Sequence, residues 1–202
     1  MNLIVLASAL IISLIVFLAT RITKDKFAQA EADFWEKERA ANSVRRKSLD
    51  DLNYLTIPVD TLPVSLHNDN DTIASCIDTI VELSKSPVVN LTGISNTDLK
   101  MKYGAPNITQ LTLYDQRYTL LASTLQKWAD ELISLNETDA ARTILEYAVS
   151  TGTDVSGTYK SLADIYDSVG DKDSIKALIP IAESLNTPLK DSIIRSLNDH
   201  LE

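Results

Sequence analysis

The side chains that most often carry out catalysis are few in this chain and widely spaced. Imidazole is available only at His67 and His200, and a thiol only at Cys76. No His lies near Cys76 in sequence to activate it, and neither His has the spacing of a metal ligand or a catalytic triad. The HExxH, GxSxG, Walker and GxGxxG motifs are absent, and five glycines leave little for a phosphate-binding loop. The sequence therefore predicts no catalytic residue, metal or cofactor, and a protein that is not an enzyme.

Two aspartate clusters raise the question of calcium, which prefers carboxylate oxygens. They are the Asp pair at 50–51 and the Asp-Asn-Asp triplet that begins at Asp69. An EF-hand loop needs a bidentate Glu at its twelfth position, and the twelfth residue counted from Asp69 is Ile80. Neither cluster is predicted to bind calcium.

The loop region 90–103 is the alternative place for chemistry. Polar residues and Gly93 cluster there without a helical period, and functional residues are often carried on loops of a rigid scaffold. An accessory or unrecognised enzyme that uses this region is therefore the second functional hypothesis. A pocket joining the loop to titratable groups with displaced pKa values would favour it, whereas a smooth helical groove would favour a binding module.

The first structural element is predicted from an apolar run, Leu3 to Leu18. As a helix, residues 2–20 would be about 28 Å long, close to the roughly 30 Å of a bilayer's hydrocarbon core. Every Lys and Arg near the run follows it, beginning at Arg21. This predicts a single-pass anchor whose residues 2–20 contact the lipid bilayer of the cell membrane, with the N-terminus outside and the C-terminal domain cytoplasmic.

Two alternatives to this topology stay open. A cleaved signal peptide fits less well, because the run is long, lacks a basic segment before it and has no A-x-A cleavage pattern. The opposite orientation would place the bulk of the chain outside. Four Asn-X-Thr triplets would then be glycosylation acceptors in a eukaryote, although chance explains them better in a chain rich in Asn and Thr: Asn70, Asn90, Asn107 and Asn136.

Charge is distributed unevenly along the chain. The net charge of −9 combines +3 over residues 21–47 with −12 over residues 48–202. A strongly acidic region repels nucleic acid, so no nucleic-acid partner is predicted. A lone Cys excludes an internal disulfide.

The chain divides into four segments by composition and period. Residues 21–42 place Phe27, Phe34 and Ala41 on one face of a helix that could lie on a membrane, pack on the domain or self-associate weakly. Residues before proline are extended, so Ile57 and Leu62 should belong to a strap on the domain surface rather than to a docking motif. The predicted segments are a transmembrane anchor (1–20), a juxtamembrane amphipathic helix (21–42), an extended Pro-containing linker (43–70) and a helical domain (71–202).

The helical domain should begin with a helix over 71–86, on which Cys76 faces the core. After Thr109 the helical pattern continues nearly to the end, with breaks at Asn136, 151–154, Gly170 and 186–188. These breaks and the residues between them repeat at an offset of 34. The matched pairs are Leu125 and Tyr159, Trp128 and Leu162, Ala129 and Ala163, Leu132 and Tyr166, Asn136 and Gly170, Ala141 and Ile175, Leu145 and Ile179, and Ala148 and Ala182.

A helix-turn-helix unit of 34 residues is the tetratricopeptide period, and residues 122–189 resemble that family. Its proline after the second helix is approximated only by Pro188, and Thr153 stands where the first unit should have it. Two units are fewer than such stacks usually need, so 71–86 and 189–201 should act as caps. The fold class predicted is all-α: an N-terminal transmembrane helix and helical stalk, then a domain of antiparallel helical hairpins similar to tetratricopeptide repeats.

The resemblance implies a concave groove lined by first-helix residues. Carboxylates there suggest a basic peptide or protein segment as partner, although a solvated helix face would have the same composition. The function predicted is a membrane-anchored scaffold or adaptor that binds a protein partner. The residues implied for binding are Gln126, Asp130, Ile133, Lys160, Asp164 and Asp167.

Overall fold

The computed structural model describes residues 3–202, and their side chains except those of residues 3–6, 9 and 10. Within these residues the chain forms helices and no strand, so the all-α class is confirmed. The helices are α1 (Leu3–Ser43), η1 (Val59–Thr61), α2 (Asp71–Ser84), α3 (Asn96–Tyr103), η2 (Ala105–Asn107), α4 (Ile108–Ser134), α5 (Thr138–Ser150), α6 (Ser156–Ser168), α7 (Lys172–Glu183) and α8 (Lys190–Asp199). They form two compact units, Met1–Lys47 with Ser95–Ile108, and Ser48–Ile94 with Thr109–Glu202.

The predicted membrane anchor is wrong, because no helix among the described residues is long and apolar enough to cross a bilayer. The first two residues of the predicted anchor and several of its side chains lie outside the part of the chain that is described. Charged residues follow the apolar run from Arg21 onward, which limits its length within α1. The single-pass location in the cell membrane and its topology, which depend on that anchor together with the bilayer contact of residues 2–20, are wrong for the same reason.

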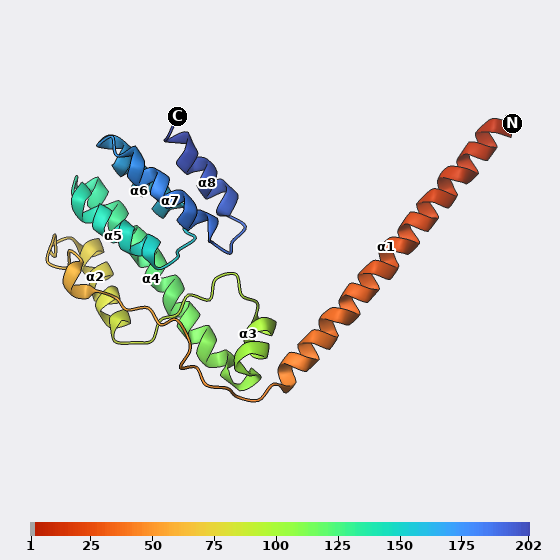
Figure 1. Ribbon diagram of the computed structural model, residues 1–202, viewed down its shortest axis with the longest axis horizontal. Coiled ribbons are helices and arrows are strands. Elements are labelled where there is room, and N and C mark those ends of the chain that lie inside the picture. Colours follow the sequence, from red (N-terminus) through yellow and green to blue (C-terminus); the bar gives the residue numbers. More distant parts are fainter. Residues whose placement is uncertain (1–2) are drawn as a thin grey trace. The chain divides into compact units, whose positions relative to one another are not determined.

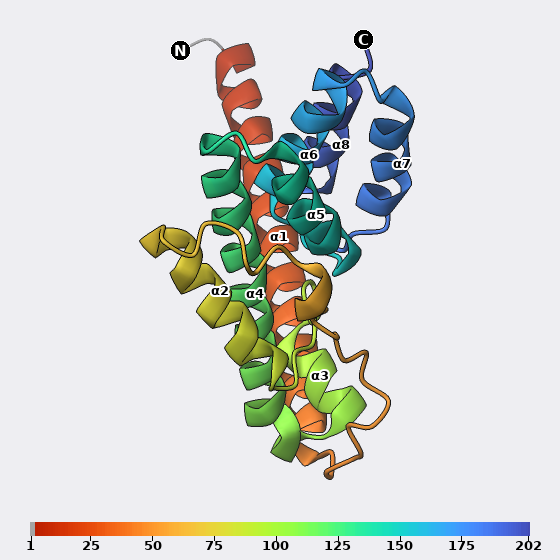
Figure 2. The same cartoon turned by 90° about the vertical axis from the view of Figure 1, so that its left-hand side faces the viewer.

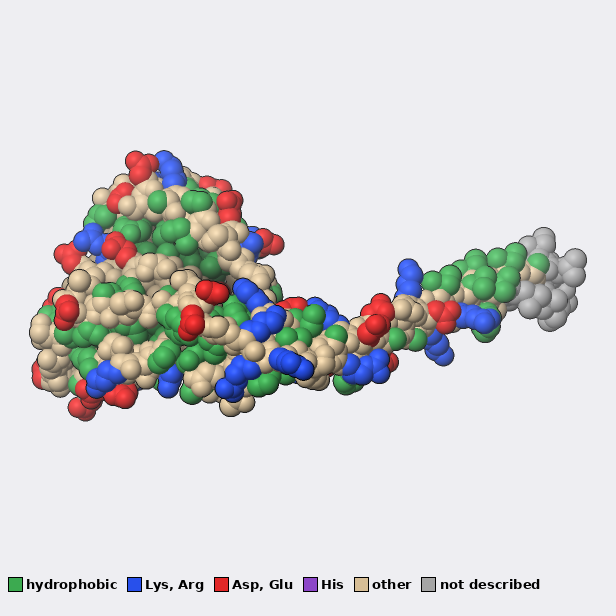
Figure 3. Space-filling view, turned by 60° about the horizontal axis from the view of Figure 1, so that its bottom comes forward, with side chains coloured by type: hydrophobic (Ala, Val, Ile, Leu, Met, Phe, Trp, Pro, Cys, Tyr) green, Lys and Arg blue, Asp and Glu red, His purple; other side chains and the backbone are tan. Residues whose placement is uncertain are grey.

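In the first unit, α1 packs its C-terminal end against α3. Lys37 Nζ lies 2.7 Å from Asp98 Oδ1, and the Glu38 carboxylate pairs with Lys100. The hydrogen bond from Lys100 is the main reason why the pKa of Glu38 is lowered. Ala41 is fully buried, whereas Phe34, predicted on the same face, is exposed. Apolar side chains remain on the surface along much of α1 (Figure 3).

In the second unit, α4 to α8 pack beside one another and α2 lies alongside α4 (Figures 1 and 2). α5 contacts α6, α6 contacts α7 and α8, and α7 contacts α8. One apolar core joins these helices, and Trp128 of α4 is its largest fully buried side chain. Cys76 on α2 is buried in this core as predicted, and burial raises the pKa of its thiol.

The segment before α2 is an extended strap that packs on the second unit. Ile57 and Leu62, the residues that precede its prolines, are buried in the core. The Tyr147 hydroxyl donates to the Thr56 carbonyl oxygen at 3.2 Å. Asn70 ends the strap and caps α2, because its side-chain oxygen accepts from two backbone N–H groups of the first turn.

The helix boundaries repeat at the offset seen in the sequence. α4 and α6 end at Ser134 and Ser168, 34 residues apart, and α5 and α7 begin at Thr138 and Lys172, again 34 apart. The start of α8 at Lys190 is one further offset from the start of α6.

The turns within the two hairpins also correspond. Asn136 and Gly170 both adopt a positive φ, at 62° and 74°. This left-handed conformation ends a helix and is open to Gly and, less readily, to Asn. The equivalent turns therefore use the two residue types that tolerate the same backbone geometry.

Candidate functional site

The residues predicted to bind a partner lie on α4 and α6 of the second unit, and we name the part of the surface that they contribute the α4/α6 face: Gln126, Asp130, Ile133, Lys160, Asp164 and Asp167. The two helices are joined across this face by a hydrogen bond of 2.7 Å from the Thr158 hydroxyl to Gln126 Oε1. The Gln126 amide in turn donates to Asp130 Oδ1 at 2.7 Å. Gln126 therefore fixes the spacing of the helices and orients a carboxylate at the same time.

A cavity of about 350 Å³ lies between α4 and α6 on this face. It collects three of the predicted residues, Asp130 and Ile133 from α4 and Asp164 from α6. Ile133 is 37% exposed, so an apolar contact is available beside two carboxylates. Neither Lys160 nor Asp167 lines this cavity. The arrangement can receive a cationic group and an apolar group together.

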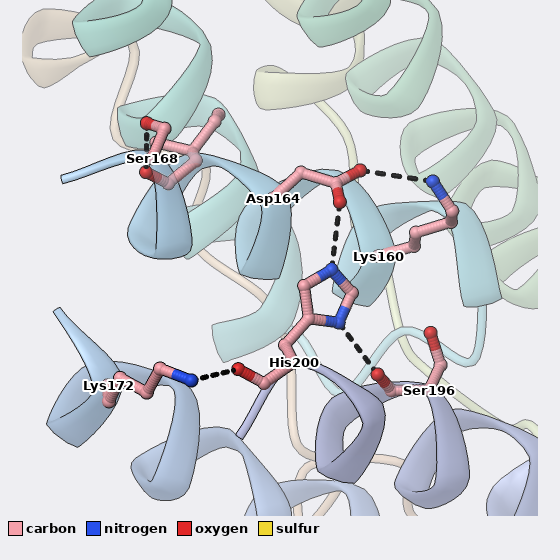
Figure 4. Close-up of polar contacts among 7 residues, drawn as sticks. Lys160, Asp164, Ser168, Lys172, Ser196 and His200 are labelled. Carbon is pink, nitrogen blue, oxygen red and sulfur yellow. Dashed lines mark hydrogen bonds and ion pairs between the residues drawn. The ribbon is translucent and has the colours of Figure 1, made fainter. Parts of the chain in front are cut away.

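Asp164 is already engaged by two basic groups of the chain itself (Figure 4). Lys160 Nζ lies 3.1 Å from its Oδ2, and His200 Nε2 lies 2.8 Å from its Oδ1. The other ring nitrogen of His200 lies 2.8 Å from the Ser196 carbonyl oxygen. With an acceptor at each nitrogen, the doubly protonated imidazolium donates to both.

This network changes the titration of both partners. The hydrogen bond to Asp164 is the main cause of the raised pKa of His200, and the Ser196 carbonyl adds to it. Burial alone would raise the pKa of Asp164, but the hydrogen bonds from His200 and Lys160 outweigh burial and lower it. Asp164 is therefore less available to a partner than Asp130 and Asp167 while His200 is charged.

His200 is the residue that the sequence reasoning missed. The sequence predicts no role for His200, because its spacing matches neither a metal site nor a catalytic triad. The available signal was the repeat itself, which places α8 in the position of a third first-helix beside α6. Lys172 holds the end of α8 as well, because its Nζ donates to the His200 carbonyl oxygen at 2.9 Å.

A second concavity of about 350 Å³, which we name the loop pocket, involves the region of the alternative hypothesis. It is lined by Asn53, Leu55, Asn90, Thr92, Asp154 and residues 150–152 and 184–187. Only two residues of the 90–103 region contribute, and the lining contains one carboxylate and no basic side chain. This lining is suited to hydrogen bonding rather than to paired acid–base chemistry.

Within the described residues, no group of three or more His, Cys, Asp or Glu side chains is placed to hold a metal ion. No family model, curated protein or solved structure matches this chain.

Proposed function

We propose that the second unit is a protein-interaction module whose α4/α6 face binds a basic peptide segment. The observation that carries this proposal is the cavity that places Asp130 and Asp164 beside the exposed Ile133. A Lys or Arg that carries an apolar neighbour matches this combination, because the Asp130 carboxylate complements the charge and Ile133 complements the apolar group. The protein would act by holding its partner, as a scaffold or adaptor does.

We further propose that residues 122–199 are a divergent array related to tetratricopeptide repeats. The 34-residue offset in helix boundaries and the matched turns at Asn136 and Gly170 support this assignment. The alanines of the pattern support it too, because Ala129, Ala163 and Ala148 are fully buried where two helices approach closely. In such an array α2 and α8 are the capping helices.

The experiment is peptide selection with the full chain as bait. A random heptapeptide library displayed on phage should be enriched in sequences that combine Lys or Arg with a large apolar residue. The selected peptides are then measured against the double variant Asp130→Lys/Asp167→Lys, which keeps Asp164 and its two direct partners, Lys160 and His200. Affinity should fall by about tenfold or more, the loss expected when charge-assisted contacts are removed.

The matched control is Asp139→Lys/Asp173→Lys. It makes the same change in net charge at two carboxylates of α5 and α7 whose side chains are 93% and 94% exposed. Peptide binding that survives the first double variant, or that falls equally in the control, would show that the α4/α6 face is not the binding site.

A further inference from the structure

Several side chains that line the loop pocket use their hydrogen-bond donors on the chain itself. The Ser150 hydroxyl donates to the Tyr147 carbonyl oxygen at 2.7 Å, and the Ser184 hydroxyl donates to the Ile181 carbonyl oxygen at 2.6 Å. The Thr151 hydroxyl makes the equivalent bond within α5. A hydroxyl has one proton and two lone pairs, so these groups offer the pocket lone pairs alone.

The amide side chains of the pocket are arranged in the same way. Asn90 Nδ2 donates to the carbonyl oxygens of Thr151 and Gly152, at 3.1 and 3.0 Å. Asn186 Nδ2 donates to the Gly93 carbonyl oxygen at 2.8 Å. Both amides use N–H donors in hydrogen bonds that hold the loops of the pocket together. A ligand that supplies hydrogen-bond donors is therefore favoured.

Electrostatics favour a positive ligand at this place. Residues 150–152 and 184–187 are the C-terminal ends of α5 and α7 and the turns after them, where the aligned peptide dipoles of a helix end in negative partial charge. Asp154 adds a full negative charge, and no Lys, Arg or His lines the pocket. The pocket therefore differs from the α4/α6 face, where Lys160 and His200 neutralise part of the acidic charge.

The frame of the pocket is fixed by close packing of its loops. Gly93 has φ of 77°, and a Cβ on it would lie 2.1 Å from the Asn186 backbone oxygen. The loop that contains Gly93 therefore packs against the turn after α7 so closely that a residue with a Cβ would clash. The Tyr118 and Tyr159 hydroxyls hold the turn after α5 in place, because they donate to the Thr151 and Thr153 carbonyl oxygens. A pocket held in this way is formed before a ligand arrives, which lowers the entropic cost of binding.

We propose that the loop pocket binds a primary ammonium group, which donates to the Asp154 carboxylate and to the hydroxyl oxygens of Ser150 and Ser184. An ammonium has three donors and no acceptor, and so complements a lining whose own donors are engaged. Two sources share this chemistry, a free alkylamine and the Lys side chain of a peptide. This site is separate from the α4/α6 face and does not depend on the function proposed for that face.

The test is titration of the full ¹⁵N-labelled chain, followed by amide chemical shifts, at constant ionic strength. Butylamine and N-acetyl-lysinamide are the cationic probes, and 1-butanol and butyrate are the neutral and anionic controls. The cations should give saturable shifts at Gly93, Gly152 and Asn186, with affinity at least about tenfold above that of butanol. Tighter binding of N-acetyl-lysinamide would identify a peptide as the source, and tighter or equal binding of butylamine a free amine.

Asp154→Asn should weaken the binding of both amines about tenfold, while Asp173→Asn, at the opposite end of α7, should leave it unchanged. Equal shifts from butanol and butylamine, or shifts that do not saturate, would overturn the proposal even if the Asp154 variant failed to fold. Because the α4/α6 variants leave this pocket intact, loss of peptide binding there would not affect the result here.

Discussion

The ion pair between His200 and Asp164 should make stability depend on pH in a defined direction. His200 has a raised pKa in the folded chain, so folding favours its protonated form. The stabilisation is therefore fully present below the unfolded pKa of about 6.5 and is lost as pH rises through the higher folded pKa. The informative perturbation is His200→Gln, which removes the charge and retains a polar side chain of similar length.

The size of the effect follows from the contact and its exposure. A hydrogen bond to a charged group contributes about 1.5–3 kcal/mol when it is sheltered from water. The His200 side chain is 17% exposed but the Asp164 side chain is 52% exposed, so solvent screening reduces that range. We expect His200→Gln to lower the free energy of unfolding by about 1 kcal/mol at pH 5.5 and by clearly less at pH 8.5.

The assay is urea unfolding of the full chain followed by circular dichroism at 222 nm, at both pH values. Asp164→Asn and the double variant complete a cycle whose coupling energy should be present at pH 5.5 and reduced at pH 8.5. Shifts of other titrating groups cancel in this comparison. A coupling energy that is independent of pH, or that grows at high pH, would refute the reasoning.

Three further predictions concern stability and use the same urea assay. Trp128→Ala should lower the free energy of unfolding by about 3–5 kcal/mol, because it removes a fully buried side chain. Trp128→Phe should lower it less, because the buried indole N–H has no hydrogen-bond partner to lose. Gly93→Ala should cost more than Gly170→Ala, about 3 kcal/mol against about 1, since both have a positive φ but only Gly93 would bring its Cβ against backbone; equal costs would contradict this account. Asn70→Ala should cost about 1 kcal/mol or more through loss of the α2 cap and of the hydrogen bond from Asn70 Nδ2 to Glu131 Oε1, and Asn70→Ser, which keeps a capping oxygen, should cost less.

An apolar run at the N-terminus suggests a helix that spans a bilayer but does not establish one. An apolar run predicts a spanning helix only where one helix is long and apolar enough to cross the bilayer, and no helix among the described residues is. The helix itself was predicted well, since α1 continues without a break through the segment expected to be a stalk. Its exposed Phe27 and Phe34 show that a repeating apolar face does not say what covers it.

Local features of this protein could be predicted from its residues alone. Helix ends coincide with Asn136 and Gly170, because a left-handed residue or a cap interrupts a helix through interactions within a few residues. The core position of Cys76 followed from helical period alone, since burial of one face is what makes a short helix stable in water.

Which distant groups meet could not be predicted in this way, because it depends on how the helices pack. Asn186 contacts Gly93 across 93 residues of sequence, and His200 contacts Asp164 across 36. Such pairs depend on how loops and helix ends are placed by the packing of whole helices, and no local period encodes that placement. The sequence predicted the residues of the α4/α6 face as a set on two helices. The basic groups that neutralise part of it and the acceptor-lined pocket became visible only once the chain was folded.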